Sequence, residues 1–241
     1  MIDNHVHIGQ FEEVYYDPIE VMETVLSLGI EGMSFSSTSS CRDGVLYQEI
    51  EKEISGFLSH ISFNVEKIRP FFWFIPDYIN QGVSIENAFD SLPYRGIKLH
   101  PFAQKWGFDD KLHMETLHSL FDYATKNHLP VLIHTGYNLV DRADRFERFF
   151  VEYPYAKCIL AHCRPLEATT RMLKKYVNVY CDTAFVEDTN IQKIINSGFR
   201  DKIIFGTDFP ITHYFKTKFP RPGDKPIISL REKYMEDIAG K

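Results

Sequence analysis

Short apolar runs alternate along the chain with longer stretches in which apolar residues recur at helical spacing. Strands of a parallel sheet covered on both faces form near-continuous apolar runs, whereas amphipathic helices place apolar residues three or four positions apart. The eight runs that we interpret as strands are Ile2–Ile8, Ile30–Phe35, Pro70–Ile75, Gly96–His100, Pro130–His134, Lys157–His162, Val177–Cys181 and Ile203–Thr207. The segments that we interpret as helices are 18–28, 43–64, 84–91, 114–127, 142–152, 166–175 and 190–197.

This order of elements predicts parallel βα units. Eight such units close a barrel, so we expect an α/β fold of the (β/α)₈ TIM-barrel type, with a doubly wound open sheet as the alternative. We find no linker or low-complexity segment, and residues 1–241 are therefore expected to form a single domain. Prolines within 212–226 argue against a helix directly after the last strand, and the eighth helix is expected at Ile227–Ile238.

Composition agrees with one large, apolar-cored domain. The chain has 241 residues, of which 44% are hydrophobic and 15% aromatic, enough for the core of one barrel. The formal net charge is −6, without a run of Lys or Arg. We therefore expect a small-molecule substrate and neither nucleic acid nor an anionic membrane as a partner. No apolar run approaches the roughly 18 residues that span a bilayer.

Cysteine usage favours a reducing compartment. Cys41, Cys158, Cys163 and Cys181 show no CxxC spacing, and Cys in an apolar strand behaves as a small hydrophobic residue. The first strand begins at residue 2, so we see no signal peptide. We expect a cytoplasmic protein without disulfides; a homodimer is expected only because dimers are common among such enzymes.

Candidate metal ligands lie at the ends of four predicted strands. His5 and His7 are two positions apart, which places them on the same face of a strand. His134, His162 and Asp208 each follow a later apolar run. The active site of a TIM barrel lies at the carboxyl ends of its strands, and neutral imidazole is a common metal ligand. The pattern therefore predicts a metal site at the mouth of the barrel.

Strand periodicity adds Lys98 and His100 to this set. These two residues share a face, as do Leu132 with His134 and Gly206 with Asp208. If those faces point into the barrel, six polar side chains converge on its mouth. Burying so many polar groups without compensation is costly, and a bound cation removes the difficulty.

Five motifs in this order resemble the amidohydrolase superfamily. They are His-x-His on the first strand, Gly-Ile-Lys-Leu-His-Pro on the fourth, Ile-His-Thr-Gly on the fifth, Ala-His-Cys on the sixth and Gly-Thr-Asp-Phe-Pro on the eighth. The fourth-strand motif resembles in particular the amidohydrolase-2 branch of metal-dependent hydrolases and decarboxylases. The resemblance covers residues 1 to about 210. It implies a divalent metal, usually zinc and sometimes manganese, as one or two ions held by His5, His7, His134 and Asp208.

The resemblance also implies roles in catalysis. His162 is a further ligand in binuclear members, or an acid/base and polarising residue in mononuclear ones. Zinc lowers the pKa of a water molecule to roughly 7. Asp208 is then the natural general base, which passes the proton to the leaving group, and His162 would stabilise the developing oxyanion.

Three residues carry open alternatives. In some binuclear members a lysine on the fourth strand is carboxylated and bridges two metals, so Lys98 is either such a bridge or an unmodified lysine that pairs with Asp208 or orients a substrate carboxylate. His100 either contacts substrate or is structural. Arg164 departs from the small or glycine-rich stretch of relatives, and its guanidinium either binds a substrate carboxylate or phosphate or forms a salt bridge to a neighbouring loop.

Weaker candidates surround this set. Residues near strand ends or on loops that could form a substrate wall are Gln104, Trp106, Tyr137, Asn138 and Asp182. The run Phe71–Phe74 is most simply interpreted as strand core, and His213 as part of a loop. We interpret His60, His113, His118 and His128 as surface or packing residues in or beside helices.

Three functions follow from these residues. The first is a metal-dependent hydrolase that attacks a C–N or C–O carbonyl bond of a small molecule. The second is a non-oxidative decarboxylase or hydratase of a small carboxylated substrate, which would use the same metal site and is favoured if Arg164 binds a carboxylate. The third is a barrel that binds metal or ligand without catalysis, against which the presence of both Asp208 and His162 argues.

Overall fold

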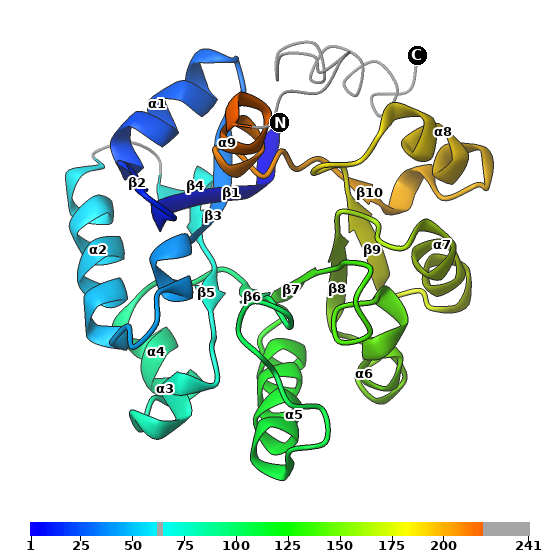
Figure 1. Ribbon diagram of the computed structural model, residues 1–241, viewed down its shortest axis with the longest axis horizontal. Helices are drawn as coiled ribbons and strands as arrows, with labels where there is room; N and C mark the ends of the chain where they lie inside the picture. Colours follow the sequence, from blue (N-terminus) through cyan, green and yellow to red (C-terminus); the bar gives the residue numbers. More distant parts are fainter. Residues whose placement is uncertain (62–64, 219–241) are drawn as a thin grey trace.

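Strands form a central ring and helices surround it, as Figure 1 shows in a computed structural model of the chain that describes residues 1–61 and 65–218. The strands are β1 (Ile2–Phe11), β2 (Val14–Tyr16), β3 (Gly32–Ser37), β4 (Ile68–Pro70), β5 (Phe72–Trp73), β6 (Ile97–Leu99), β7 (Pro130–His134), β8 (Lys157–Ala161), β9 (Val179–Asp182) and β10 (Ile203–Ile204). The α-helices are α1 (Pro18–Ser27), α2 (Tyr47–His60), α3 (Asp77–Asn80), α4 (Ile85–Ser91), α5 (Lys111–Lys126), α6 (Glu147–Glu152), α7 (Leu166–Lys175), α8 (Asp188–Asn196) and α9 (Ile211–Lys218).

Neighbouring strands pair in parallel around this ring, except that β2 pairs antiparallel with β1. One sheet has the order β2-β1-β3-β4, and the other has the order β10-β9-β8-β7-β6-β5. The two sheets meet at consecutive strands, because a single residue separates β4 from β5. At the other seam, main-chain N–H groups of Asn4 and His7 donate to the carbonyl oxygens of Phe205 and Phe209 at 3.0 and 2.7 Å. The predicted (β/α)₈ TIM barrel is therefore the observed fold.

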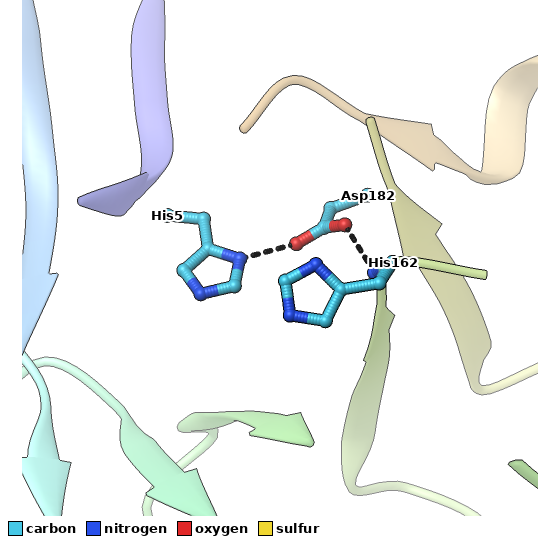
Figure 2. A group of neighbouring side chains, drawn as sticks. All are labelled: His5, His162 and Asp182. Carbon is cyan, nitrogen blue, oxygen red and sulfur yellow. Dashed lines mark hydrogen bonds and ion pairs between the residues drawn. The ribbon is translucent and has the colours of Figure 1, made fainter. Parts of the chain in front are cut away.

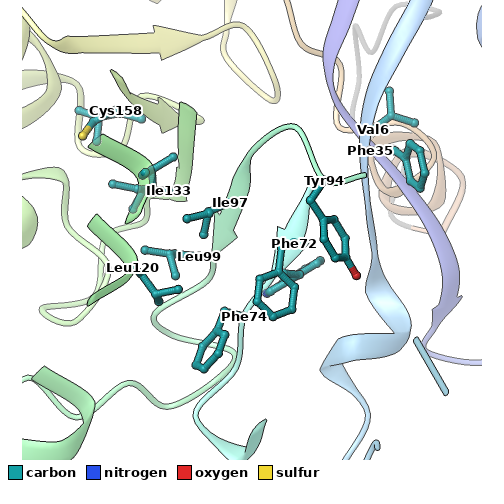
Figure 3. Close-up of a cluster of buried hydrophobic side chains, with 14 of the residues drawn as sticks. Val6, Phe35, Phe72, Phe74, Tyr94, Ile97, Leu99, Leu120, Ile133 and Cys158 are labelled. Atoms are coloured by element: carbon teal, nitrogen blue, oxygen red, sulfur yellow. The ribbon is translucent and has the colours of Figure 1, made fainter. Parts of the chain in front are cut away.

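Two apolar clusters stabilise the barrel. The larger lies between strands and helices, and Figure 3 shows Ile97, Leu99 and Ile133 gathered with Leu120 of α5. The smaller consists of strand residues and the residue between β4 and β5, with the buried members Phe71, Leu132, Ile159 and Ala161. Because this second cluster draws on no helix, it fills the inside of the ring. Each buried large side chain contributes roughly 1.5–3 kcal/mol to folding.

Local sequence explains where several elements begin and end. The Asp17 carboxylate accepts hydrogen bonds from the main-chain N–H groups of Ile19 and Glu20 at 2.9 and 3.2 Å, and Pro18 occupies the first turn of α1. This is the expected N-terminal capping arrangement. Strand β7 and helix α7 have the predicted bounds. The 3₁₀ turn Ala143–Phe146 and α6 together replace the single helix predicted over 142–152.

Two larger differences from the prediction concern the end of β1 and the segment after β10. β1 continues three residues beyond Ile8 and pairs with β2 as an antiparallel hairpin, which the polar residues of that stretch did not indicate. The segment after β10 forms α9, where a loop containing His213 was predicted. Its inward side is formed by Ile211, Thr212 and Tyr214, all buried, and the prolines that argued against a helix begin only at Pro220.

The remaining predictions concern the last part of the chain and helices that could span a membrane. The helix expected at Ile227–Ile238 lies outside the described residues, as does the predicted end of the second helix at 62–64. In the part of the chain that the structure describes, no helix is both long and apolar enough to cross a membrane.

Candidate metal centre

Three of the predicted ligands meet at the seam between β1 and β10. His5 and His7 project from β1, and Asp208 lies just beyond β10. Asp208 Oδ1 is 3.1 Å from His5 Nε2 and 2.9 Å from His7 Nε2. All three side chains are buried, and one candidate ligand atom of each lies within 4.8 Å of the other two. The i, i+2 spacing on β1 thus directs both imidazoles to one point, as predicted.

The outer nitrogen of His5 is held by a carboxylate on β9. Asp182 Oδ2 lies 2.7 Å from His5 Nδ1, and neither side chain is exposed by more than 1%. Figure 2 shows this contact together with the one between Asp182 and the main chain of His162. Burial raises the pKa of Asp182 to about 6. Asp182 therefore lies behind His5 and His162, not in a substrate wall as the sequence indicated.

His7 has a more adaptable environment on its outer side. Its Nδ1 lies 3.3 Å from the carbonyl oxygen and 3.1 Å from the hydroxyl of Ser36 on β3. The carbonyl can only accept and the hydroxyl can also donate, so either tautomer of His7 is satisfied. The ring centroid of Trp73 is 5.3 Å from that of His7. Trp73 is thus part of the site, which the interpretation of Phe71–Phe74 as plain strand core missed.

Lys98 reaches the same point from β6. Its ammonium nitrogen is 2.8 Å from His5 Nε2 and 5.5 Å from the centre of the Trp73 ring. Burial lowers the pKa of Lys98 to about 8. Pairing with Asp208 was one predicted alternative, but the nearest partner that the structure records is the imidazole of His5. Lys98 therefore places a cationic group within hydrogen-bond distance of His5.

A second pair of imidazoles lies beside this triple. His162 Nε2 is 3.0 Å from His134 Nδ1, and His162 Nδ1 is 3.1 Å from the carbonyl oxygen of Ala184. Since a carbonyl can only accept a hydrogen bond, Nδ1 of His162 carries the hydrogen. Burial lowers the pKa of His162. Neutral His162 therefore presents an unprotonated Nε2 to the site, which can accept a proton or bind a metal.

His134 stands apart from the compact ligand groups. The two groups of potential ligands within 4.8 Å of one another among the described residues are His5–His7–Asp208 and His5–His162–Asp182, and neither includes His134. Its ring is stacked on that of His100, with centroids 3.6 Å apart. The structure thus brings His134 to the edge of the site, in contact with His162 and His100.

A buried carboxylate lies on the far side of His134. Asp141 Oδ2 is 3.9 Å from His134 Nε2, and the other oxygen of Asp141 is buried without a hydrogen-bond partner in the described structure. Burial raises the pKa of Asp141. An unsatisfied buried oxygen lowers the stability of the fold, and this points to a functional role for Asp141. The sequence did not single it out.

His100 and Arg164 line the neighbouring part of the mouth. The ring of His100 lies between those of Trp73 and His134, and burial lowers the pKa of His100. The guanidinium of Arg164 donates to the carbonyl oxygen of Phe185 at 3.4 Å and its Cζ lies 5.6 Å from the Phe185 ring centre. The predicted loop contact of Arg164 is thus made through a carbonyl and a ring, not through a salt bridge.

The site lowers the pKa values of Asp208 and of two of its imidazoles, for different physical reasons. Burial alone would raise the pKa of Asp208, but the neighbouring His5 and His7 lower it well below its ordinary value. Burial and the charge of Lys98 lower the pKa of His5, and burial lowers that of His134. The lowered pKa values favour a neutral His5, a neutral His134 and an ionised Asp208, which is the protonation state that metal binding needs.

Backbone conformation also singles out these positions. His162 and Asp208 have φ angles of 68° and 58°, in the left-handed region that residues other than glycine rarely adopt. Such conformations persist where the surrounding structure determines them and cluster at functional sites. His162 directly follows β8, and Asp208 lies a short way beyond β10, so in both the left-handed backbone occurs after a strand, where the side chains meet.

The atoms that meet here fit a divalent cation. Because Nδ1 of His5 faces a carboxylate, the hydrogen of a neutral His5 lies on Nδ1 and its Nε2 is a lone pair. That lone pair lies 3.1 Å from Asp208 Oδ1 and 2.8 Å from the ammonium of Lys98, so two acceptors here already face a positive charge, and a divalent cation would satisfy them in the same way. Imidazole nitrogen and carboxylate oxygen are ligands that zinc and manganese accept.

Comparison with known proteins agrees with this description. A family model described as Amidohydrolase matches residues 67–227, about two thirds of the chain. A search of curated proteins finds no match.

Solved structures with the same fold are similar to this chain at low identity. An amidohydrolase from Mycobacterium avium subsp. paratuberculosis is 13% identical, with a TM-score of 0.54 over 93% of this chain and 73% of that one. A 5-carboxyvanillate decarboxylase from Novosphingobium aromaticivorans, complexed with manganese and 4-hydroxy-3-methoxy-5-nitrobenzoic acid, is 10% identical (TM-score 0.56, covering 89% and 76%). A phosphotriesterase homology protein from Escherichia coli with phosphate in its active site is 9% identical (TM-score 0.55, covering 86% and 82%).

At these identities the solved structures show only that the fold is similar, whereas the family match rests on the sequence itself. It extends over the β6, β7, β8 and β10 strand ends that carry Lys98, His134, His162 and Asp208. The chain belongs to the amidohydrolase family.

Proposed function

We propose that this protein is a metal-dependent hydrolase that attacks a C–N or C–O carbonyl bond of a small molecule at the mouth of the barrel. The observation that carries the proposal is the meeting of His5, His7 and Asp208 within 4.8 Å. The outer nitrogen of His5 is already occupied by Asp182. The ligand atoms are thus held in place by the fold before any metal arrives, as a preorganised site requires.

His5, His7 and Asp208 would hold the metal, with His134 as the fourth ligand. The ion, zinc or manganese, supplies Lewis acidity and makes a water molecule more acidic. His162 has its Nε2 directed at His134 and is suited to be a ligand for a second ion or a proton acceptor. The proposal therefore covers one or two ions and leaves the ligand role of His162 to measurement.

Proton transfer falls to Asp208 and His162. Asp208 Oδ1 faces both His5 and His7, which leaves Oδ2 to take the proton from the attacking water and pass it to the leaving group. A neutral His162 whose Nδ1 donates to Ala184 cannot donate from Nε2 to an oxyanion. The geometry thus favours His162 as a proton acceptor over the oxyanion role inferred from the sequence.

Lys98 and the mouth residues would orient the substrate. The ammonium of Lys98 lies within the site beside Trp73 and can stabilise negative charge on an attacked carbonyl. His100 and Arg164 stand at the rim, where a ring and a guanidinium can contact a substrate. The substrate is proposed to be a small molecule with an anionic group, because both cations line one mouth.

A decarboxylase or hydratase is the alternative. Two observations favour it: the cations Lys98 and Arg164 suit a substrate carboxylate, and one structure with the same fold is a decarboxylase complexed with manganese. Both reactions use the same metal site, so the reaction type must be read from products. A cytoplasmic location and a homodimer remain predictions from the sequence.

Elemental analysis of protein purified without chelators tests the proposal. We expect about one transition metal per chain, lost in His7→Gln and retained in His60→Gln, which changes an exposed histidine at the end of α2. Protein stripped of metal should lose activity and regain it with zinc or manganese. A panel of esters, lactones, amides and aromatic carboxylates, followed by proton release and by CO₂ release, separates hydrolysis from decarboxylation. No metal uptake, or equal loss in both variants, contradicts the proposal.

A further inference from the structure

Asp182 is a fully buried carboxylate that touches three segments of the site. Its Oδ2 lies 2.7 Å from His5 Nδ1. Its Oδ1 accepts hydrogen bonds from the main-chain N–H groups of His162 at 2.9 Å and Ala184 at 3.2 Å. Figure 2 shows the side chain between His5 and the backbone of His162. One carboxylate thus connects β1, the end of β8 and the end of β9.

This arrangement argues against a metal bound by Asp182 itself. His5, His162 and Asp182 satisfy the distance criterion for a ligand group, with ligand atoms within 4.8 Å of one another. However, one oxygen of Asp182 receives two N–H donors and the other faces an imidazole nitrogen at 2.7 Å. A metal at this oxygen would displace a short charge-assisted hydrogen bond. Asp182 is therefore engaged with the protein and not open to an ion.

We propose that Asp182 is a positioning residue that keeps the hydrogen of His5 on Nδ1, so that Nε2 faces Asp208 and the metal, and that fixes the strained turn carrying His162. The consequence for metal binding rests on the proposed function. The claim about the tautomer concerns the protein without metal and stands apart from it. Carboxylates behind metal-binding histidines typically act in this way.

The chemistry of the contact between Asp182 and His5 determines which nitrogen of His5 carries the hydrogen. An ionised carboxylate only accepts hydrogen bonds, so the hydrogen between Asp182 and His5 belongs to the imidazole. Lys98 acts in the same sense, because its ammonium donates to His5 Nε2 at 2.8 Å. A test of Asp182 must therefore remove Lys98, and Lys98→Met does so with a side chain of similar length.

Replacing Asp182 by Asn reverses the direction of the hydrogen bond to His5 Nδ1 and keeps the shape of the side chain. The two main-chain N–H groups at Oδ1 require an acceptor, so the amide oxygen is expected at that position. The amide NH₂ then occupies the place of Oδ2 and donates to His5 Nδ1. In the Lys98→Met background, the hydrogen of His5 is therefore expected to move to Nε2, where it blocks a metal.

Long-range ¹⁵N–¹H spectra of the metal-free protein measure this directly, with His5 assigned by its absence in His5→Gln. Lys98→Met should show His5 with hydrogen on Nδ1, and Lys98→Met/Asp182→Asn should show it on Nε2. Hydrogen on Nε2 in Lys98→Met overturns the proposal, and this measurement remains decisive if the double variant does not fold. An unchanged Nδ1 tautomer in the folded double variant also overturns it.

Affinity for zinc alone, measured by competition with a chelator, tests the consequence. Asp182→Asn should weaken zinc binding by about 10–100-fold, whereas Asp201→Asn, which removes an exposed carboxylate, should leave it unchanged. Equal affinity in wild type and Asp182→Asn contradicts the role of Asp182 in metal binding. If the wild type binds no metal, the proposed function fails, while the tautomer spectra still decide whether Asp182 positions His5.

Discussion

Lys98 Nζ lies 2.8 Å from His5 Nε2, the nitrogen that also faces Asp208 Oδ1 at 3.1 Å. A lysine on β6 therefore occupies space beside the imidazole of His5 that a bound metal would also need. Burial lowers the pKa of Lys98 to about 8, and the direct contact with His5 Nε2 is one that an unmodified Nζ makes. The geometry favours the unmodified lysine of the two sequence-based alternatives.

Lys98→Met is expected to tighten metal binding and to reduce turnover. The variant removes a positive charge that repels the cation, and relief of about 1.4 kcal/mol corresponds to a tenfold gain in affinity. Turnover should fall because the charge that stabilises the attacked carbonyl is lost. Metal titration and steady-state kinetics measure both effects. Metal content that depends on bicarbonate, with a carbamate signal in ¹³C spectra, would instead identify Lys98 as a carboxylated bridge.

Asp208→Asn is expected to lower kcat by about 10²–10⁴-fold, the usual contribution of a general base. The amide cannot accept the proton of the attacking water, although its oxygen can still face His5 and His7. Turnover must be compared at equal metal content, measured on the same samples, because Asp208 is also a proposed ligand. Unchanged turnover in the metal-loaded variant would refute the assignment of Asp208 as the base.

Leu132→Ala is expected to lower the free energy of unfolding by about 2–5 kcal/mol, the usual cost of a cavity in a packed core. Leu132 is 3% exposed and belongs to the cluster inside the ring, two residues before His134. The matched control is Leu112→Ala, at a position 50% exposed on α5, which should change stability by no more than about 0.5 kcal/mol. Urea unfolding measures both. Similar values for the two variants would mean that the inner cluster does not support the barrel.

The site residues were predictable because strand ends carry positional information. Each candidate residue lies in or after an apolar run, and a parallel barrel gathers the ends of such runs; the residues are His5, His7, His134, His162 and Asp208. Asp182 was recognised as a strand-end residue, but its role depends on a contact with β1 across β10. Sequence spacing says nothing about that contact, because it joins residues 177 positions apart.

Other features lay beyond the sequence for different physical reasons. The run Phe71–Phe74 is apolar on both faces, so it has no alternation that would separate Trp73, which faces the ligands, from Phe72, which faces Tyr47 and Tyr78. Helix α9 was missed because prolines further along suggested an irregular segment. Its residues Tyr214 and Phe215 contact Phe11 of the β1–β2 hairpin, a partner that was itself unpredicted.

The contacts of Asp144 with two arginines predict that the stability of the folded state falls in acid. Burial alone would raise the pKa of Asp144, but hydrogen bonds from Arg142 and Arg171 lower it below its ordinary value of 3.8. The carboxylate therefore stabilises the folded state above that value, and the contribution is lost as the pH falls through the lowered pKa. Asp144→Asn should be less stable than wild type at pH 7 by about 0.2–1 kcal/mol. Urea midpoints that differ equally at neutral and strongly acid pH would contradict this.

Asp141→Asn is expected to affect stability and metal binding in opposite directions. Asp141 buries an oxygen without a partner in the described structure, so removing its charge should leave the free energy of unfolding unchanged or raise it by about 1 kcal/mol. The same change removes a negative charge 3.9 Å from His134 Nε2 that would attract a bound cation, and should reduce zinc affinity by about tenfold, which corresponds to about 1.4 kcal/mol. Thermal unfolding of the metal-free protein and chelator competition measure the two effects. Lower stability with unchanged affinity would show that Asp141 serves the loop that follows β7 and not His134.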